Sequence, residues 1–364
     1  MSKVLVTLVS EQTIPNVEFI REMEDQVDRF LFISTERMEK VGNRQWILDT
    51  VKLDQEKVLD PLIVDAFSFE DIEEKLIQAV NDEDTYIVNL TGGTKIMSLA
   101  VYEFFKTLRS EMFYLTGRGE KIKVHPGRKK TSSRLKAKIS LSDYLSAYGF
   151  EIKNQSTPIR SKETTEKFLG YFLHQFDQEN DVPVLEKLRK YRDKGLKDIK
   201  EDKILNAFLD RIEFKVENEN KLSKYECQYL SGDWLEEYLL DFLKENFDIP
   251  ESSIGLSLSV NKGGSPNEFD VLLMKNNKIY LFECKTSVFL HTDESQTFIG
   301  ETIYKSDSLR NKFGLFAQTT VVTLSDLNNP KLKIHLERAD ANRVKLIGKS
   351  SFLNGTLFEE LKKI

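Results

Sequence analysis

Two acidic residues and a lysine are spaced for metal-assisted chemistry in the stretch EFDVLLMKNNKIYLFECKT. Apolar runs flank Asn276 and Asn277, a pair typical of a tight β-hairpin turn. A two-residue loop places Asp270 opposite Glu283, with their Cβ atoms roughly 4.5–5.5 Å apart. Carboxylates that close repel each other and require a shared proton or a cation. Lys285 points to the same side as Glu283. This is the arrangement of a metal-dependent phosphodiesterase site.

Each of these residues has a physical role in such a site. Asp270 and Glu283 offer the oxygen ligands that suit Mg²⁺ or Mn²⁺, and the backbone carbonyl of Cys284 could add another. Lys285 can orient or help to deprotonate the attacking water, or stabilise charge on the phosphate. The alternative is an edge hairpin with a cross-strand salt bridge.

A predicted helix upstream offers a further acid. The segment SGDWLEEYLLDFLKENF begins with Ser231 or Asp233 as a helix cap and ends near Phe247. Glu236 borders the apolar face of this helix, whereas Glu237 lies nearer the opposite side. We therefore expect Glu236 to join the carboxylates, with Glu237 as the alternative.

A second group of residues has the character of an anion-binding loop. Thr91-Gly92-Gly93-Thr94-Lys95 lies between a buried strand and a helix. Glycines let the backbone approach a ligand, helix N-terminal N–H groups favour an anion, and the lysine adds positive charge. The loop matches neither the Walker nor the GxGxxG pattern. An ordinary strand-to-helix turn would also explain the two glycines.

Alternating strands and helices position this loop. Strands are predicted over residues 3–9, 29–34, 61–67 and 85–90, and helices over 16–25, 36–50, 69–80 and 95–109. This alternation is typical of a parallel, doubly wound sheet, which binds ligands outside the carboxyl ends of its strands. The loops after the first and fourth strands should therefore lie at one site.

The rest of the chain reads as two further units. Residues 142–226 are highly charged and mostly helical in pattern, and the sequence does not reveal their function. The last unit begins with the Glu236 helix and continues with a strand near 254–260 and the hairpin. A helix over 294–311 and strands near 314–323 and 331–338 are predicted to follow. Residues Gln296, Lys305 and Arg310 of this late helix could contact substrate phosphates or be ordinary solvated residues.

Two resemblances follow from these motifs. The order of acidic helix, strand, Asp270 strand, Glu283-Cys284-Lys285 strand, helix and strand resembles the PD-(D/E)xK nuclease superfamily, with Phe269 where that motif has proline. VSEQTIPNVEFI and NLTGGTK together resemble the CARF domain, the sensor of cyclic oligoadenylates in type III CRISPR immunity. The combination resembles the CRISPR ancillary nucleases.

The resemblance implies an α/β fold in three parts. These are a Rossmann-like, doubly wound CARF domain over residues 1–145, a helical connector over 146–224, and a PD-(D/E)xK restriction-endonuclease-like domain over 225–364. It also implies a homodimer that binds one cyclic oligoadenylate, most often cyclic tetra-adenylate, across its two-fold axis. Binding would bias the dimer toward a state in which the nuclease sites engage substrate.

The same resemblance assigns residues to these roles. The residues expected to contact the ligand are Ser10, Gln12, Thr13, Thr35, Thr91, Gly92, Gly93, Thr94 and Lys95. The expected metal ligands, for Mn²⁺ or Mg²⁺, are Asp270, Glu283, the carbonyl of Cys284 and Glu236. The expected catalytic set is Glu236, Asp270, Glu283 and Lys285.

The leading hypothesis is a metal-dependent endonuclease that cyclic tetra-adenylate activates. Its substrate could be single-stranded DNA, RNA or duplex DNA that it nicks, and the sequence does not choose among them. One alternative is a constitutive restriction- or repair-type nuclease whose N-terminal domain only assembles the dimer. The other is a non-enzymatic, ligand-responsive DNA-binding regulator that uses the helical middle segment.

Composition predicts a cytoplasmic protein without a membrane partner. The 364 residues are 40% hydrophobic and 31% charged, as in ordinary globular proteins. The chain has no run of 18 apolar residues, no signal-peptide pattern and no disulfide framework in Cys227 and Cys284. The net charge is −6, yet residues 118–138 hold nine Lys or Arg against one acid. That stretch is either a solvated face or a patch for a polyanion.

Overall fold

Apolar strands near the N-terminus form the predicted sheet in the computed structural model, which describes residues 1–127, 129, 131–286, 300–305 and 310–362. The strand order is β3-β2-β1-β4-β5-β6-β7, with β1 to β5 parallel and β6 and β7 antiparallel. The strands are β1 (Lys3–Leu8), β2 (Arg29–Ser34), β3 (Leu62–Ile63), β4 (Thr85–Asn89), β5 (Glu111–Leu115), β6 (Glu120–His125) and β7 (Thr131–Arg134).

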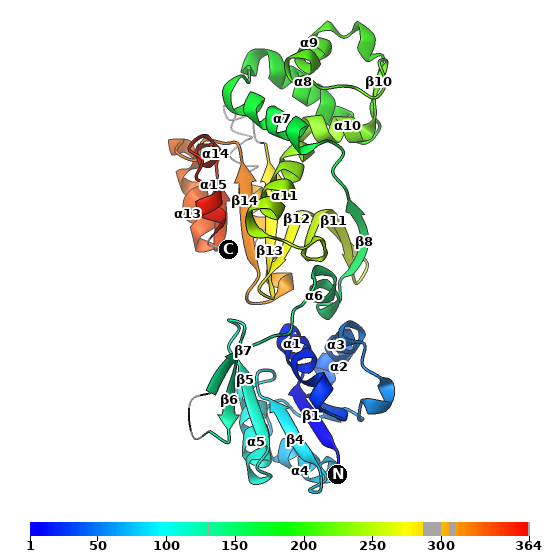
Figure 1. Ribbon diagram of the computed structural model, residues 1–364, viewed down its shortest axis with the longest axis vertical. Helices are drawn as coiled ribbons and strands as arrows, with labels where there is room; N and C mark the ends of the chain where they lie inside the picture. The colour runs from blue at the N-terminus through cyan, green and yellow to red at the C-terminus, as the bar shows by residue number, and fades with distance from the viewer. Residues whose placement is uncertain (128, 130, 287–299, 306–309, 363–364) are drawn as a thin grey trace.

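Helices cover this sheet on both faces (Figure 1). They are α1 (Ile14–Met23), α2 (Glu36–Val41), α3 (Asn43–Val51), α4 (Phe69–Ala79) and α5 (Lys95–Thr107), followed by α6 (Leu141–Ala147). The helix predicted over 36–50 is two helices, because Gly42 ends α2 with a φ of 97°. A doubly wound sheet was predicted from the sequence, and the structure confirms it.

A second sheet forms the middle of the molecule in Figure 1. Its strand order is β15-β14-β13-β12-β11-β8, a mixture of antiparallel and parallel pairs. The strands are β8 (Glu151–Ser156), β11 (Ile254–Lys262), β12 (Ser265–Lys275), β13 (Lys278–Lys285), β14 (Gln318–Thr323) and β15 (Val344–Ile347). The helices α11 (Trp234–Phe247), α13 (Lys333–Ala341), α14 (Lys349–Leu353) and α15 (Leu357–Leu361) belong to the same unit.

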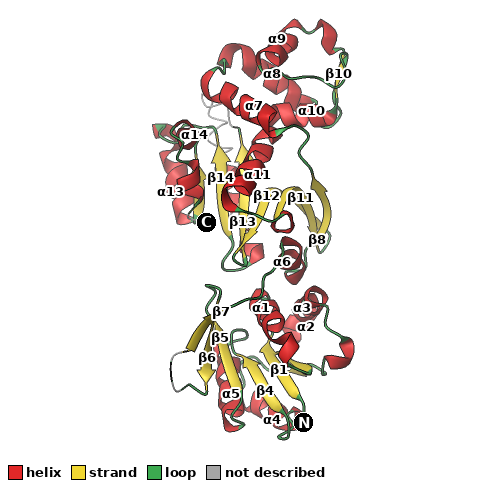
Figure 2. Ribbon diagram, in the orientation of Figure 1, coloured by secondary structure: helices red, strands yellow, loops and turns green. Residues whose placement is uncertain are grey.

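A helical unit lies at the end of the molecule farthest from the N-terminal sheet (Figure 2). It contains α7 (Lys162–His174), α8 (Gln178–Lys190), α9 (Lys203–Arg211), α10 (Lys224–Gln228) and a short ribbon of β9 (Leu196–Lys197) with β10 (Lys221–Leu222). The stretch predicted as a helical connector also supplies β8, which pairs with β11 in the second sheet. The connector is therefore helical only in part.

The strand predicted near 331–338 is wrong, because this stretch forms α13. The alternation of Lys and hydrophobic residues there suggested a strand. However, Asn329 caps a turn that leads through Pro330 into the helix. The buried residues Leu332, His335 and Ala339 then follow helical spacing, with His335 and Ala339 one turn apart.

One apolar cluster joins the N-terminal half to the second sheet. It includes Phe19 of α1, Leu145 of α6, Leu272 of β12, Ile279 of β13 and Phe313. Helix α6 lies between the two sheets in Figure 1. The two halves of one chain are therefore packed against each other through a continuous core.

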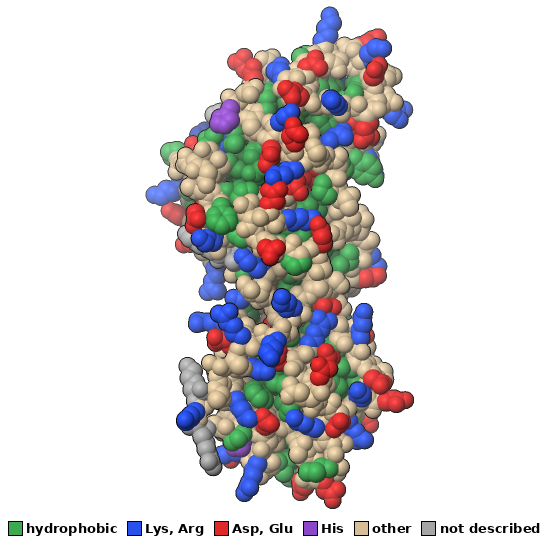
Figure 3. Space-filling view, in the orientation of Figure 1, with side chains coloured by type: hydrophobic (Ala, Val, Ile, Leu, Met, Phe, Trp, Pro, Cys, Tyr) green, Lys and Arg blue, Asp and Glu red, His purple; other side chains and the backbone are tan. Residues whose placement is uncertain are grey.

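The lengths of the helices and the distribution of surface charge bear on membrane and polyanion binding. Among the residues that the structure describes, every helix is too short or too polar to cross a bilayer. In Figure 3, Lys and Arg side chains are interspersed with Asp and Glu over both halves. Within the basic stretch 118–138, Lys121 pairs with Glu22 and Lys123 with Glu111, so part of its charge is neutralised inside the N-terminal unit.

Candidate functional site

The hairpin has the predicted register. Lys275 pairs with Lys278 and Val271 with Phe282. Asn276 and Asn277 have φ values of 53° and 57°, as the two central residues of a type I′ turn require. Asp270 and Glu283 are the next residues outward from the last of these pairs.

Lys285 holds the two acids together at the end of the hairpin. Its Nζ lies 3.0 Å from Oδ2 of Asp270 and 2.9 Å from Oε1 of Glu283. The backbone N–H of Cys284 also donates to Oδ2 of Asp270, over 2.7 Å. Lys305 adds a second cation, with its Nζ 3.1 Å from Oε1 of Glu283. Two carboxylates, both largely buried, therefore share an electrostatic centre with two lysines.

The pKa values in this centre reflect burial and crowding. Burial and the charge of Glu283 raise the pKa of Asp270 to about 6, although Lys285 and the N–H of Cys284 favour its charged form. Burial disfavours the ammonium of Lys285, but the two carboxylates outweigh it and raise its pKa. The lysine therefore stays charged and offsets part of the repulsion between the acids.

Glu236 faces this centre and Glu237 does not. Burial and the nearby charges of Asp270 and Asp233 raise the pKa of Glu236 well above its ordinary value. Ser257 of β11 donates to Oε2 of Glu236 over 2.8 Å. Glu237 instead accepts the backbone N–H groups that precede α7, from Ile159 at 2.9 Å and from the next residue at 3.4 Å. Glu237 thus fixes the chain entering the helical unit.

Two further acids border the centre, and neither they nor Lys305 could be singled out from the sequence. Asp233, at the start of α11, pairs with Arg192 from the helical unit over 2.7 Å. Glu268 lies two residues before Asp270 and so projects from the same face of β12. Lys305 was one of several candidates on the late helix. Of the others, Arg310 donates to the carbonyl of Asn342, and Gln296 lies outside the described residues.

The two carboxylates form the smallest set of oxygen ligands that suits a hard divalent cation. Magnesium is commonly held by one or two carboxylates together with water and substrate phosphate. Asp270 and Glu283 supply such a pair, since both bond the same ammonium group. In the described parts of the chain, no three Asp, Glu, His or Cys side chains are grouped closely enough to form a complete metal cage.

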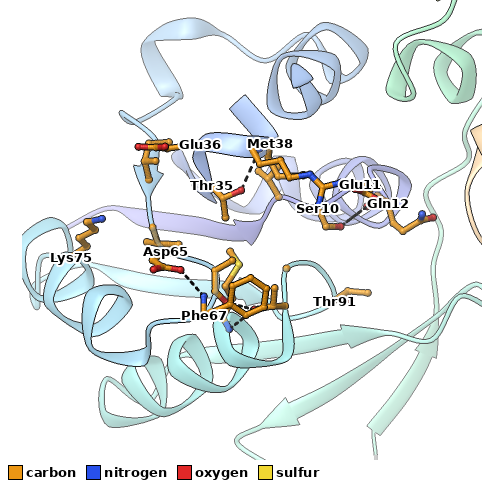
Figure 4. Close-up of a pocket in the computed structure, with 18 of the residues that line it drawn as sticks. Ser10, Glu11, Gln12, Thr35, Glu36, Met38, Asp65, Phe67, Lys75 and Thr91 are labelled. Carbon is orange, nitrogen blue, oxygen red and sulfur yellow. Dashed lines mark hydrogen bonds and ion pairs between the residues drawn. The ribbon is translucent and has the colours of Figure 1, made fainter. Parts of the chain in front are cut away.

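A second site lies at the carboxyl ends of β1, β2, β3 and β4, at the switch point of the N-terminal sheet. It is a pocket of about 990 Å³ (Figure 4). Of the residues expected to contact a ligand, six line it: Ser10, Gln12, Thr35, Thr91, Gly93 and Thr94. The loops after the first and fourth strands therefore meet as predicted from topology, and the loop after the second strand joins them through Thr35.

Hydroxyl groups of the pocket also hold its loops in place. Thr94 caps α5 by accepting from the N–H of Met97, and its own hydroxyl donates to the carbonyl of Ala66 over 2.6 Å. Thr91 accepts the backbone N–H of Leu115 over 2.8 Å. Thr35 caps α2. These bonds fix loops from three different strands relative to one another.

The other three expected residues lie outside the pocket lining. Thr13 is fully buried and its hydroxyl donates to the carbonyl of Ala147 in α6, so it supports the loop from behind. Gly92 is buried where the loop crosses β1, and a Cβ there would lie 2.0 Å from the carbonyl oxygen of Leu8. Lys95 is exposed at the start of α5.

The pocket also contains residues that the sequence reasoning missed. They come from the start of α2, the loop after β3, the helices α4 and α5 and the segment before β14: Glu36, Arg37, Met38, Asp65, Phe67, Lys75, Met97 and Leu315. Phe67 is 79% exposed although it is aromatic. Figure 4 shows Asp65 and Phe67 together on one side of the pocket, where the N–H of Phe67 donates to Asp65 over 2.9 Å. The β3 loop could have been included, because it too follows a parallel strand.

Comparisons with known proteins match a separate family model to each of two parts of the chain. Residues 4–144 match the family model described as the Card1 CARF domain, and residues 223–362 match the Card1-like endonuclease domain. Together these models cover more than half of the chain. A comparison with curated protein sequences gave no match.

Solved structures show the same fold along the whole chain. Can2 from Sulfobacillus thermosulfidooxidans, in complex with cyclic tetra-adenylate, is 22% identical with a TM-score of 0.74, covering 98% of both chains. Protein VC1899 from Vibrio cholerae is 18% identical with a TM-score of 0.74, covering 99% of this chain and 98% of that one. A type III CRISPR defence DNA nuclease activated by cyclic oligoadenylate is 16% identical with a TM-score of 0.54, covering 88% of this chain and 45% of that one. The chain therefore belongs to the family of CRISPR ancillary nucleases that join a Card1-type CARF domain to a Card1-like endonuclease domain.

Proposed function

We propose that this protein is a metal-dependent endonuclease that hydrolyses phosphodiester bonds in DNA or RNA when cyclic tetra-adenylate occupies its CARF pocket. The observation that carries the nuclease assignment is Lys285, which bonds both Asp270 and Glu283 at the end of one hairpin. Holding two acids close together in a buried setting costs free energy of folding. A functional requirement for both acids, as in a cleavage site, explains why the chain keeps them. A structural salt bridge would need only one of the two acids.

The residues divide the work of cleavage among them. Asp270 and Glu283 would hold Mg²⁺ or Mn²⁺, helped by Glu236 and the carbonyl of Cys284. The bound metal would supply Lewis-acid stabilisation of charge on the scissile phosphate. Lys285 keeps its proton and can donate to the phosphate or orient the attacking water. Lys305, whose Nζ lies 3.1 Å from Oε1 of Glu283, can move to a substrate phosphate.

The pocket suits a cyclic oligoadenylate in both of its chemical parts. Adenine bases can stack on the exposed ring of Phe67, and phosphates can pair with Arg37 and Lys75 at the rim. Thr91 and Thr94 present polar groups beside the start of α5, where backbone N–H groups favour an anion. Ser10 and Thr35 complete the wall on the β1 and β2 side, and Gly93 belongs to the wall after β4.

A homodimer would complete this site. Exposed apolar side chains lie on the same half of the molecule as the pocket, including Phe67 within it, Leu99 on α5 and Tyr114 on β5. A second copy would cover these side chains. A cyclic ligand with two-fold symmetry would then contact the same residues of both copies.

The test is a cleavage assay with three kinds of nucleic acid, because the preferred substrate is not specified by the proposal. The protein is incubated with Mn²⁺ and single-stranded RNA, single-stranded DNA or supercoiled plasmid, with and without cyclic tetra-adenylate. We expect cleavage of at least one substrate only when the activator is present, and none by Glu283→Gln. Equal cleavage without the activator would favour the constitutive nuclease, and specific duplex binding without cleavage would favour the DNA-binding regulator.

A further inference from the structure

A segment of the nuclease half reaches into the sensor pocket. This bridging segment, Phe313–Ala317, precedes β14 in the sequence. Leu315 lines the pocket and is 78% exposed, an unusual state for a leucine. Its backbone N–H donates to Oε1 of Gln12, over 3.0 Å. Figure 4 shows the side chain of Gln12 directed away from the middle of the pocket, as this bond requires.

Close contacts hold the bridging segment against the CARF half. Tyr148, directly after α6, donates to the same Oε1 of Gln12 over 3.1 Å, and Tyr144 of α6 donates to the carbonyl of Phe313 over 2.7 Å. Gly314 has a φ of 89°, and a Cβ there would lie 2.1 Å from the hydroxyl of Tyr148. Only glycine suits this backbone and this approach.

A second glycine shows how closely the halves meet. A Cβ on Gly117 of the CARF half would lie 2.2 Å from the ring of Phe316. The bridging segment therefore has contacts on both sides of Leu315, and its position is tied to the pocket wall.

The other end of the bridging segment leads to the cleavage site by two routes. Phe313 packs edge-on against Phe269 with ring centroids 5.2 Å apart, and Phe269 directly precedes Asp270. The segment also continues into β14, where Val321 pairs with Glu283 in the sheet. A shift of the segment would thus act on the strands that carry both acids.

We propose that Leu315 is a ligand-contacting residue that the nuclease half supplies to the sensor pocket, and that the bridging segment couples pocket occupancy to the cleavage site. The ligand part it suits is an apolar base face, because the leucine offers no polar group. This inference rests on the proposed function. The coupling runs within one protomer. Because such coupling is reciprocal, a ligand bound at the cleavage site would change the affinity of the pocket by the same factor.

A single fluorescent label tests whether residue 315 lies close to the bound ligand. Leu315→Cys is labelled with an environment-sensitive fluorophore. The native thiols do not interfere, because Cys227 and Cys284 are 0% and 6% exposed. The matched control is Leu353→Cys, an exposed leucine of α14 outside the pocket lining. Calorimetry with cyclic tetra-adenylate measures binding to each labelled protein in parallel.

We expect the label at position 315 to respond with the same midpoint as the calorimetric titration, and the label at 353 to stay silent. Binding by calorimetry with a silent label at 315 would overturn this inference and leave the proposed function standing. No heat of binding for the unlabelled wild-type protein would overturn both.

Coupling is tested by removing single hydroxyl groups. Tyr144→Phe deletes the bond to the carbonyl of Phe313, and Tyr148→Phe deletes one bond to Gln12. The control is Tyr229→Phe, which deletes a buried tyrosine hydroxyl that bonds Thr165 in the helical unit. We expect activator-dependent cleavage to fall about fivefold in the first two variants, as for one lost hydrogen bond, and to be unchanged in the control. Wild-type activation in both Tyr144→Phe and Tyr148→Phe would refute the coupling.

Discussion

The contact between the hairpin turn and the CARF half makes stability depend on pH through Glu18. This residue of α1 is buried, and Oε1 accepts from Nδ2 of Asn277 over 2.9 Å. Asn277 is a central residue of the hairpin turn that presents the cleavage site, and it also donates to the carbonyl of Ala137. Burial raises the pKa of Glu18 from 4.5 to about 7, although the bond from Asn277 favours the charged form.

The size of the effect follows from this shift. Each pKa unit corresponds to about 1.36 kcal/mol, so ionised Glu18 costs the folded state about 3 kcal/mol. Because the folded pKa is raised, the stabilising contribution is fully present below pH 4.5 and is lost as pH rises through 7. Tyr144 of α6 and Tyr148 directly after it also face Glu18, but burial raises their pKa values and they stay neutral over this range.

Glu18→Gln removes the titration and keeps an acceptor for Asn277. Near pH 4.5 the variant and the wild-type protein should be almost equally stable. At pH 8 the variant should be more stable by up to about 3 kcal/mol. With an unfolding entropy of about 2.1 cal/mol/K per residue over 364 residues, its melting midpoint should be about 4 °C higher.

Thermal and urea melts at pH 4.5, 6, 7 and 8 measure this difference. The matched control is Glu22→Gln, one turn along the same helix. Burial acts against the charge of Glu22, but bonds from Lys121 and from the N–H groups of Ala137 and Lys136 lower its pKa. Glu22→Gln should therefore destabilise the protein to a similar extent at pH 6, 7 and 8, and less at pH 4.5. The reasoning is refuted if Glu18→Gln is no more stable than wild type at pH 8, or if the two proteins differ equally at every pH.

Three further predictions concern the two sites. Glu283→Gln should lose the stabilisation by Mn²⁺, which for the wild-type protein is about 2.7 kcal/mol at 100 times the dissociation constant, and thermal melts with and without EDTA check this. Glu236→Gln should lower activated cleavage at least about 10²-fold, whereas Glu237→Gln, whose partners are backbone N–H groups before α7, should keep it; equal losses would contradict the assignment. Phe67→Ala should weaken calorimetric binding of cyclic tetra-adenylate by about 1–3 kcal/mol, while Phe69→Ala, exposed but outside the pocket lining, should bind normally.

The hairpin shows what the sequence could predict. Its register follows from local information alone: two continuous apolar runs, a two-residue turn and the period of the strand. That information placed Asp270, Glu283 and Lys285 on one face, and the structure confirms their contact. The helical period also favoured Glu236, whose raised pKa reflects the nearby charge of Asp270. The period did not predict that Glu237 is buried as well, at 5% exposed, because its partners are backbone N–H groups of the distant chain before α7.

Other parts depended on contacts between distant segments. Leu315 enters the pocket from about 300 residues beyond Gln12, and no pattern in the sequence encodes that meeting. Thr13 had the right type and loop for a ligand contact, yet α6 packs behind it and takes its hydroxyl. The strand predicted over 331–338 was wrong because a Pro-containing cap and tertiary burial overrode the local alternation.

The central claim is that the CARF pocket controls the cleavage site. The most direct measurement is the rate of single-stranded nucleic acid cleavage in Mn²⁺ as cyclic tetra-adenylate is titrated, with binding followed by calorimetry in the same buffer. The account predicts that cleavage rises from background with the same midpoint as binding, and that Glu283→Gln binds normally but never cleaves. Cleavage that is independent of bound cyclic tetra-adenylate, or that survives in Glu283→Gln, would contradict it.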